Sequence, residues 1–109
     1  MIQKSMTEFS IEFDPAKDEQ NWKKHKIRFA TAALVFADPY RVERLDDSLE
    51  NPGEERWQTL GKVGTVLFVV FTERGSSIRI ISARVATKQE RRSYYGFDDS
   101  NGKNWSAAD

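Results

Sequence analysis

Basic and aromatic side chains gather in residues 79–95, RIISARVATKQERRSYY, beside an apolar stretch. The wider segment 74–95 has six arginine or lysine residues and a single acid, Glu90. A guanidinium group can hold a phosphate through two parallel hydrogen bonds, and a tyrosine ring can stack on an unpaired base. The segment therefore allows an anion site, with RNA as a ligand that would use both kinds of side chain. A solvated basic surface is the alternative.

Arg79 lies on a predicted strand, and Arg84 ends that strand. Strict alternation turns Ile78 and Ile80 toward the core and Arg79 toward the opposite, more open face. It also turns Arg84 away from Arg79, unless a bulge or the turn into the next helix re-aims it. Arg79 could bind a phosphate, or it could form an ion pair with a carboxylate such as Glu73.

The predicted C-terminal helix carries a basic stripe that ends in an aromatic residue. Lys88, Arg91, Arg92 and Tyr95 follow the i, i+3, i+4, i+7 spacing of one helical face. This stripe could contact RNA, or it could be an ordinary solvated face.

Groups for proton transfer lie elsewhere in the chain. His25 follows Lys24 near the end of the first predicted helix. Its reference pKa suits acid–base chemistry at neutral pH, although a histidine there also stabilises the helix dipole. Glu54, Glu55 and Arg56 open a predicted strand, where they could add a carboxylate and a cation to the same cleft or form only a loop salt bridge.

The residue types that are missing narrow the possible chemistry. The chain has no cysteine and one histidine, which excludes a thiolate nucleophile and a cysteine-based or histidine-rich metal site. Cleavage of RNA by its own 2′-hydroxyl needs only a base, an acid and cations that stabilise the pentacoordinate phosphate. We therefore expect a reaction that uses no metal and no cofactor.

These side chains need a scaffold, and the sequence pattern predicts one. The first predicted elements are a strand at 8–14, a helix from Asp14-Pro15 to about His25, and a second helix from Phe29 to the Asp38-Pro39 break. Four strands follow, at 40–45, 56–63, 65–71 and 78–83. The last element is a helix that is capped by Thr87 and Glu90 and ends near Tyr95. The expected fold class is α+β, with an antiparallel sheet and helices mainly on one face.

The composition fits one domain, residues 1–109, with a core at about 8–95 and a polar tail at 96–109. Phe97 and Trp105 are the candidate anchors of the tail. The 17 basic and 17 acidic residues balance, which argues against an indiscriminate nucleic-acid coat. No apolar run could cross a bilayer, and the N-terminus lacks the apolar region of a secretory signal. We therefore expect a cytoplasmic protein that does not contact membranes.

Four segments in order resemble the BrnT family of bacterial type II toxins: IEFDPAKDEQNWKKHKIRF, ALVFADP, GEERWQTLGKV and FTERGSSIRIISARVATKQERRSYY. The resemblance covers roughly residues 9–95. It implies a RelE-like ribonuclease fold, cleavage of cellular RNA and growth inhibition. It also implies neutralisation by a cognate BrnA-like ribbon-helix-helix antitoxin. The antitoxin would bind operator DNA, and the toxin would contact that DNA only through the antitoxin.

The motif residues and their chemistry give a candidate site. The predicted catalytic residues are Arg79 and Arg84 as phosphate ligands, Glu55 or His25 as the base, and Tyr94 as an acid or a base-stacking residue. The predicted substrate-binding residues are Lys24, Arg56, Lys88, Arg91 and Arg92, and no metal ligands are predicted. A non-catalytic module whose basic face only binds an acidic antitoxin is the alternative function.

Two residues depart from the family pattern beside His25. Lys26 stands where the family usually has glycine, so the turn must either hold a left-handed lysine or change shape. Arg28 replaces a small hydroxyl residue and so removes an N-cap from the second helix.

Overall fold

The computed structural model describes residues 10–47, 53–96 and 105–108. Its elements are, in order, β1 Ser10–Glu12, α1 Pro15–His25, α2 Phe29–Ala32, the 3₁₀ helix η1 Ala33–Ala37, β2 Val42–Asp46, β3 Arg56–Val63, β4 Thr65–Arg74, β5 Ser77–Val85, α3 Lys88–Tyr95 and β6 Ser106–Ala107. The α+β class is confirmed. The second predicted helix is one α-helical turn that continues as η1.

The six strands form one mixed sheet in the order β1-β5-β4-β3-β2-β6. Strands β2 to β5 form the predicted antiparallel meander. β1 instead runs parallel to β5, with Ser10 opposite Ser77, so the prediction of a purely antiparallel sheet was wrong. Alternation shows which face a side chain takes, but it does not give the direction of a neighbouring strand 67 residues away.

The last strand, β6, comes from the segment predicted as a polar tail. It pairs with β2, and the Ala108 N–H donates to the Arg41 carbonyl at 2.9 Å. The Arg44 guanidinium lies 4.1 Å from the centre of the Trp105 ring, which also packs against the sheet. Trp105 is therefore confirmed as an anchor, whereas Phe97 lies outside the described residues.

The two unusual residues between α1 and α2 are accommodated without a change in the turn. Lys26 takes the left-handed conformation, with φ of 60°, and its N–H donates to the Trp22 carbonyl at 2.9 Å. Arg28 makes no side-chain cap, but the Asp18 carboxylate accepts a hydrogen bond from the Phe29 N–H at 2.8 Å. A residue of α1 thus replaces the missing N-cap of α2.

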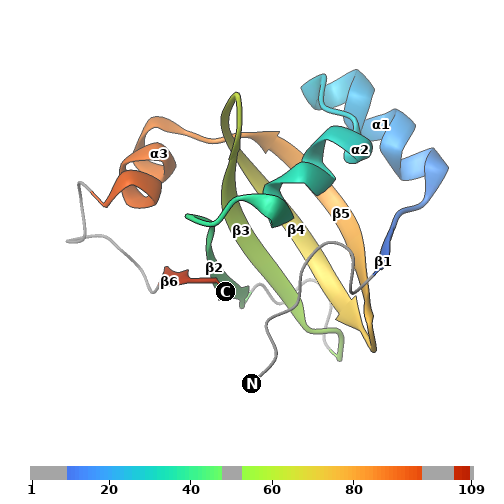
Figure 1. Ribbon diagram of the computed structural model, residues 1–109. Coiled ribbons are helices and arrows are strands. Elements are labelled where there is room, and N and C mark those ends of the chain that lie inside the picture. The colour runs from blue at the N-terminus through green and yellow to red at the C-terminus, as the bar shows by residue number, and fades with distance from the viewer. Residues whose placement is uncertain (1–9, 48–52, 97–104, 109) are drawn as a thin grey trace.

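Apolar side chains pack against both faces of the sheet. One face lies under α1, α2 and η1 and holds the larger cluster, which includes Phe29, Phe71 and Ile80 (Figure 1). On the opposite face Leu60 and Phe68 belong to a second cluster, against which Tyr94 of α3 packs. Two of the predicted helices therefore share a face, while α3 lies against the other.

Candidate functional site

A bulge in β5 brings Arg79 and Arg84 to the same face of the sheet. Arg79 pairs with Thr72 of β4 and Arg84 pairs with Phe68, while Ile81 between them is the extra residue. Thr72 and Phe68 are four residues apart on β4, so they share a face. The bulge considered from the sequence is thus confirmed. We call the face opposite α1 and α2 the arginine face, because it carries Arg44, Arg56, Arg74, Arg79 and Arg84.

One row of polar side chains crosses the arginine face. The strand register places one residue each from β1, β5, β4, β3 and β2 side by side: Glu12, Arg79, Thr72, Arg56 and Asp46. The position of Arg56 follows from the pair Trp57–Phe71, one step before it. We call these five residues the charged row.

Carboxylates contact the arginines of this row. The Arg79 Nε lies 3.2 Å from a carboxylate oxygen of Glu12. The Arg56 Nε lies 3.1 Å from Glu54, whose other oxygen is 3.6 Å from Arg74. The Arg79 side chain is 37% exposed, and so open an ion pair contributes little to stability. A phosphate could therefore replace the Glu12 contact at small cost.

The structure places Glu54, rather than Glu55, against these arginines. Glu55 is exposed and immediately precedes β3. Glu54 lies two residues before Arg56, so both side chains project to the same face. Glu12 had a signal in the sequence, because it alternates with Ile11 and Phe13, which pack against the cluster on the other face.

Arg84 is held more tightly than Arg79. Its two terminal nitrogens donate to the two oxygens of Glu90 at 2.9 and 3.0 Å, and its guanidinium lies 4.1 Å from the centre of the Phe68 ring. Burial acts to raise the pKa of Glu90, but the hydrogen bonds from Arg84 and Thr87 outweigh burial and lower it. Glu90 also closes the capping box of Thr87, so this ion pair fixes the start of α3 to the sheet.

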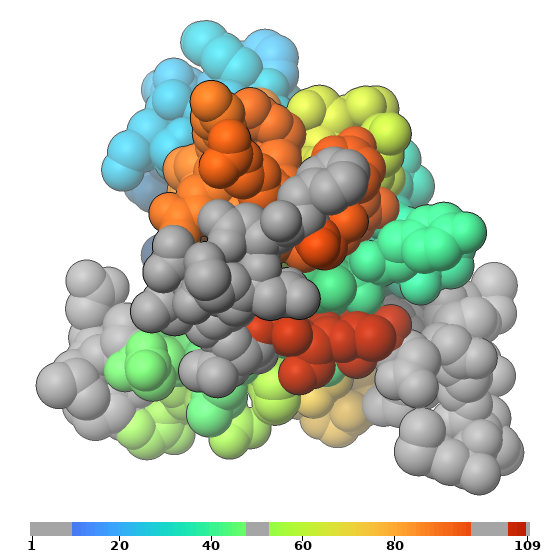
Figure 2. All heavy atoms as spheres, turned by 90° about the vertical axis from the view of Figure 1, so that its left-hand side faces the viewer, coloured from blue at the N-terminus to red at the C-terminus, as the bar shows by residue number. Residues whose placement is uncertain are grey.

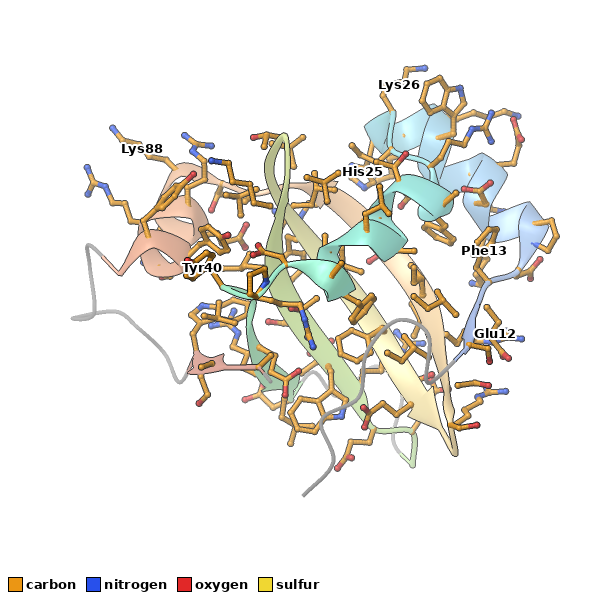
Figure 3. The ribbon with its side chains drawn as sticks, in the orientation of Figure 1. Glu12, Phe13, His25, Lys26, Tyr40 and Lys88 are labelled. Carbon is orange, nitrogen blue, oxygen red and sulfur yellow. The ribbon has the colours of Figure 1, made fainter. Side chains whose placement is uncertain are left out.

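The other predicted cations of α3 are partly or fully open to solvent. Lys88 and Arg92 are exposed, and Figure 3 shows Lys88 projecting outward from the helix. Arg91 is half-buried and donates to the Ala86 carbonyl at 3.1 Å. The predicted basic stripe therefore exists, with Lys88 and Arg92 as its accessible charges.

Tyr94 is tied to the start of β2 through a carboxylate. Its hydroxyl donates to Asp38 at 2.6 Å, and the Lys62 N–H donates to the same oxygen at 2.7 Å. Burial and the neighbouring Asp38 carboxylate raise the pKa of Tyr94. Burial acts to raise the pKa of Asp38 as well, but its hydrogen bonds from Tyr94, Lys62 and Tyr40 lower it. Tyr94 is therefore protonated and Asp38 ionised at neutral pH.

A cleft of about 770 Å³ lies beside this hydrogen bond, between η1, the β3–β4 turn and the end of α3. Figure 2 shows the face of the molecule on which α3, β6 and the segment before β2 meet. Three large side chains that line the cleft are well exposed, namely Leu34, Tyr40 and Tyr95, at 49, 76 and 46%. The Lys62 ammonium lies 5.7 Å from the centre of the Tyr95 ring. The cleft thus joins aromatic surface to two opposite charges, those of Lys62 and Asp38.

Lys24 and His25 lie at the far end of α1, which packs against β5. Asn21 donates to the Ala83 carbonyl at 2.9 Å and accepts from the Ala83 N–H at 3.1 Å. His25 follows Asn21 by one turn, at the end of α1 (Figure 3). His25 is half-buried, whereas Lys24 is exposed. These two residues therefore lie near the C-terminal half of β5.

The predicted site residues fall into two groups. Arg79 and Arg56 belong to the charged row, whereas the remaining cations and Tyr94 lie toward α3 and the end of α1. Arg79 and Arg84 lie opposite Thr72 and Phe68, which are four residues apart on β4, so at about 3.3 Å per residue they are about 13 Å apart along the sheet. Because Glu90 holds the Arg84 guanidinium, we infer that the two groups contact different phosphates.

Two further features concern the described part of the chain. No group of three or more aspartate, glutamate or histidine side chains converges there in a way that could hold a metal ion. None of its helices has the length and apolarity needed to span a membrane.

The chain resembles proteins of known family and structure. Residues 13–90 match a family described as the ribonuclease toxin, BrnT, of type II toxin–antitoxin systems. The crystal structure of the Brucella abortus ribonuclease toxin, BrnT, at 1.1 Å resolution matches with a TM-score of 0.54 and 21% sequence identity. The match covers 73% of this chain and 99% of that chain, and it supports a common fold. No curated protein matches the chain.

Proposed function

Because the chain belongs to the BrnT family of ribonuclease toxins of type II toxin–antitoxin systems, we propose that it cleaves RNA without a metal ion, at the charged row of the arginine face. The 2′-hydroxyl of the RNA attacks the adjacent phosphate, and the 5′-oxygen of the next nucleotide leaves. The products are a 2′,3′-cyclic phosphate and a 5′-hydroxyl end.

The observation that supports this site most directly is the placement of Arg79 and Arg56 on either side of one β4 residue. Negative charge grows on the phosphate oxygens in the transition state, and two guanidinium groups fixed by the sheet can meet that charge without reorganising. The planar fork of arginine suits the two equatorial oxygens of the phosphate.

Carboxylates in direct contact with these arginines are the candidate bases. Glu12 and Glu54 both lie against the row, and either could accept the proton of a 2′-hydroxyl positioned there. Glu55 and His25, named from the sequence, would have to act from outside the row. Tyr94 suits base stacking better than proton transfer, since its proton is held by Asp38.

The second group of cations would hold RNA beyond the cleaved phosphate. Its members are Lys24, Lys88, Arg91 and Arg92, whereas Arg84, which Glu90 holds, mainly fixes α3. The rings of Tyr40 and Tyr95 near α3 could stack on an unpaired base. A sheet with α1, α2 and η1 on one face, and with this site and α3 on the other, is the RelE-like arrangement that we infer for the single domain. A ribbon-helix-helix antitoxin of the BrnA type would be the partner and would alone contact operator DNA.

The decisive experiment uses the purified protein and a single-stranded RNA. Cleavage should be unchanged in EDTA, and a substrate with deoxyribose at the cleaved position should resist it, because the nucleophile is missing. The upstream product should end in a 2′,3′-cyclic phosphate or its hydrolysed 3′-phosphate. Loss of cleavage in EDTA, or a product with a 5′-phosphate, would show that the mechanism is wrong.

A further inference from the structure

Thr72 has a hydroxyl group that the fold does not satisfy. The residue is 2% exposed, and its Oγ1 is the one buried side-chain polar atom without a hydrogen-bond partner in the described part of the chain. Thr59 of β3 is equally buried, but its hydroxyl donates to the Val42 carbonyl at 2.8 Å. A buried polar atom without a partner is rare in folded proteins and requires an explanation.

The sequence around Thr72 makes a purely structural explanation weak. Thr72 follows Val69, Val70 and Phe71 in a buried strand. Valine has nearly the same shape as threonine and an equal preference for strands, and it would leave no polar atom without a partner. The hydroxyl therefore costs stability where an apolar residue would fit.

The position of the hydroxyl indicates what it could bind. Thr72 pairs with Arg79 on one side, and Arg56 lies beside it on the other. Neighbouring strands are about 4.8 Å apart, so Thr72 lies midway between two arginines whose backbones are about 10 Å apart. Arg79 uses its Nε for Glu12, and no bond from its terminal nitrogens is seen within the described residues. These long side chains flank the hydroxyl and can turn toward an anion.

We propose that the Thr72 hydroxyl donates a hydrogen bond to the phosphate that Arg56 and Arg79 hold, so that the three residues form one anion site across β3, β4 and β5. This inference rests on the proposed function and adds a neutral donor to it. A bound phosphate would give this hydroxyl the acceptor that the described residues do not provide.

The test compares Thr72→Val, Thr72→Ser and the matched control Thr59→Val. Thr72→Val should lower kcat/KM for RNA cleavage by about 10-fold or more, while its melting temperature stays the same or rises, because an unsatisfied polar atom is removed. Thr72→Ser should keep most of the activity. Thr59→Val should do the reverse, with a lower melting temperature and an unchanged rate per folded molecule.

Binding of an uncleavable RNA with deoxyribose at the cleaved position gives a second measurement. Thr72→Val should weaken this binding without changing its salt dependence, since a hydroxyl neutralises no phosphate charge.

Wild-type protein that cleaves no RNA would overturn the proposed function itself. A wild-type protein that cleaves, with Thr72→Val equally active, would overturn this inference alone. If Thr72→Val does not fold, the comparison of Thr72→Ala with Thr72→Ser decides: equal activities overturn the proposal, and loss in alanine alone supports it.

Discussion

Two arginines on the same strand have different surroundings, and these assign them different roles. Arg84 makes two short hydrogen bonds to Glu90 and stacks on Phe68, so its charge is already compensated. Within the described residues, Arg79 forms one ion pair, with the partly exposed carboxylate of Glu12. We infer that Arg84 mainly fixes α3, whereas Arg79 can exchange its partner for substrate.

Arg79→Ala should lower the rate of RNA cleavage by about 10²-fold or more, because it removes a charge that stabilises the transition state. Arg79→Lys should rescue little activity, since an ammonium lacks the planar fork. Arg28→Ala is a matched control, because Arg28 is also a half-exposed arginine in ion pairs, at 41% exposure. Single-turnover rates and circular dichroism spectra of the three variants provide the measurement.

The same variant separates the enzyme from a non-catalytic binding module. An enzyme with Arg79→Ala would lose cleavage and keep most of its affinity for the antitoxin. Weaker antitoxin binding with an unchanged rate of RNA cleavage would instead contradict a catalytic role for Arg79.

Individual residues of the site differ in how far the sequence reveals them. The isoleucines on either side of Arg79 determine its face, and alternation was sufficient to predict it. The choice between Glu54 and Glu55 depends on the first residue of β3, and strand boundaries are the least certain part of a pattern. Thr72 could not be found at all, because an unsatisfied hydroxyl appears only when the neighbouring strands are in place.

At the scale of elements, two side chains close open strand edges. Asn21 pairs with both backbone groups of Ala83 on β5. Asp38 accepts from the Lys62 N–H of β3, just before the start of β2. These contacts position α1 and η1 against the sheet, and they also cover donors and acceptors that could pair with another chain.

Two carboxylates attach α3 to the rest of the protein, and both have a lowered pKa. A carboxyl group whose pKa is lowered by folding stabilises the protein above its unfolded pKa, and this stability is lost as the pH falls. We therefore expect the melting temperature to drop as the pH falls below the ordinary values of 3.8 for Asp38 and 4.5 for Glu90.

Thermal melting of Glu90→Gln and Asp38→Asn between pH 3 and pH 7 tests this expectation. Both variants should be less stable than wild type near pH 7 and should lose less stability on acidification. Glu73→Gln, which removes an exposed carboxylate from β4, is the control for the lost charge. Melting curves that shift in parallel with wild type would exclude these two carboxylates as the acid-sensitive contacts.

Elements with local signals were predictable, whereas those that depend on distant partners were not. The Thr87–Glu90 capping box and the Asp14 cap gave the starts of α3 and α1. The parallel direction of β1 and the pairing of β6 with β2 depend on strands far along the chain. The bulge at Ile81 was partly predictable, because the sequence allowed a bulge near Arg84 but did not give its position.

For the whole molecule, charge is divided along the chain. Residues 38–55 contain seven acids and two arginines, whereas residues 74–95 contain six basic residues and one acid. The basic segment supplies β5 and α3, and hence much of the arginine face and one rim of the cleft. A protein with no net charge can therefore still present one cationic surface to a polyanion or to an acidic partner.

We expect the antitoxin to bind this surface and to exclude RNA from it. Type II antitoxins act by binding the toxin protein, and an acidic segment of the partner would pair with the exposed cations of α3 while its chain covers the charged row. Addition of one equivalent of antitoxin should therefore abolish RNA cleavage.

The double reversal Lys88→Glu and Arg92→Glu should weaken antitoxin binding by about 10-fold or more and reduce the dependence of that binding on salt. Lys17→Glu with Lys23→Glu makes the same charge change on exposed positions of α1 and should leave the affinity nearly unchanged. A saturated complex that still cleaves RNA at the rate of the free protein would show that the antitoxin binds a different surface.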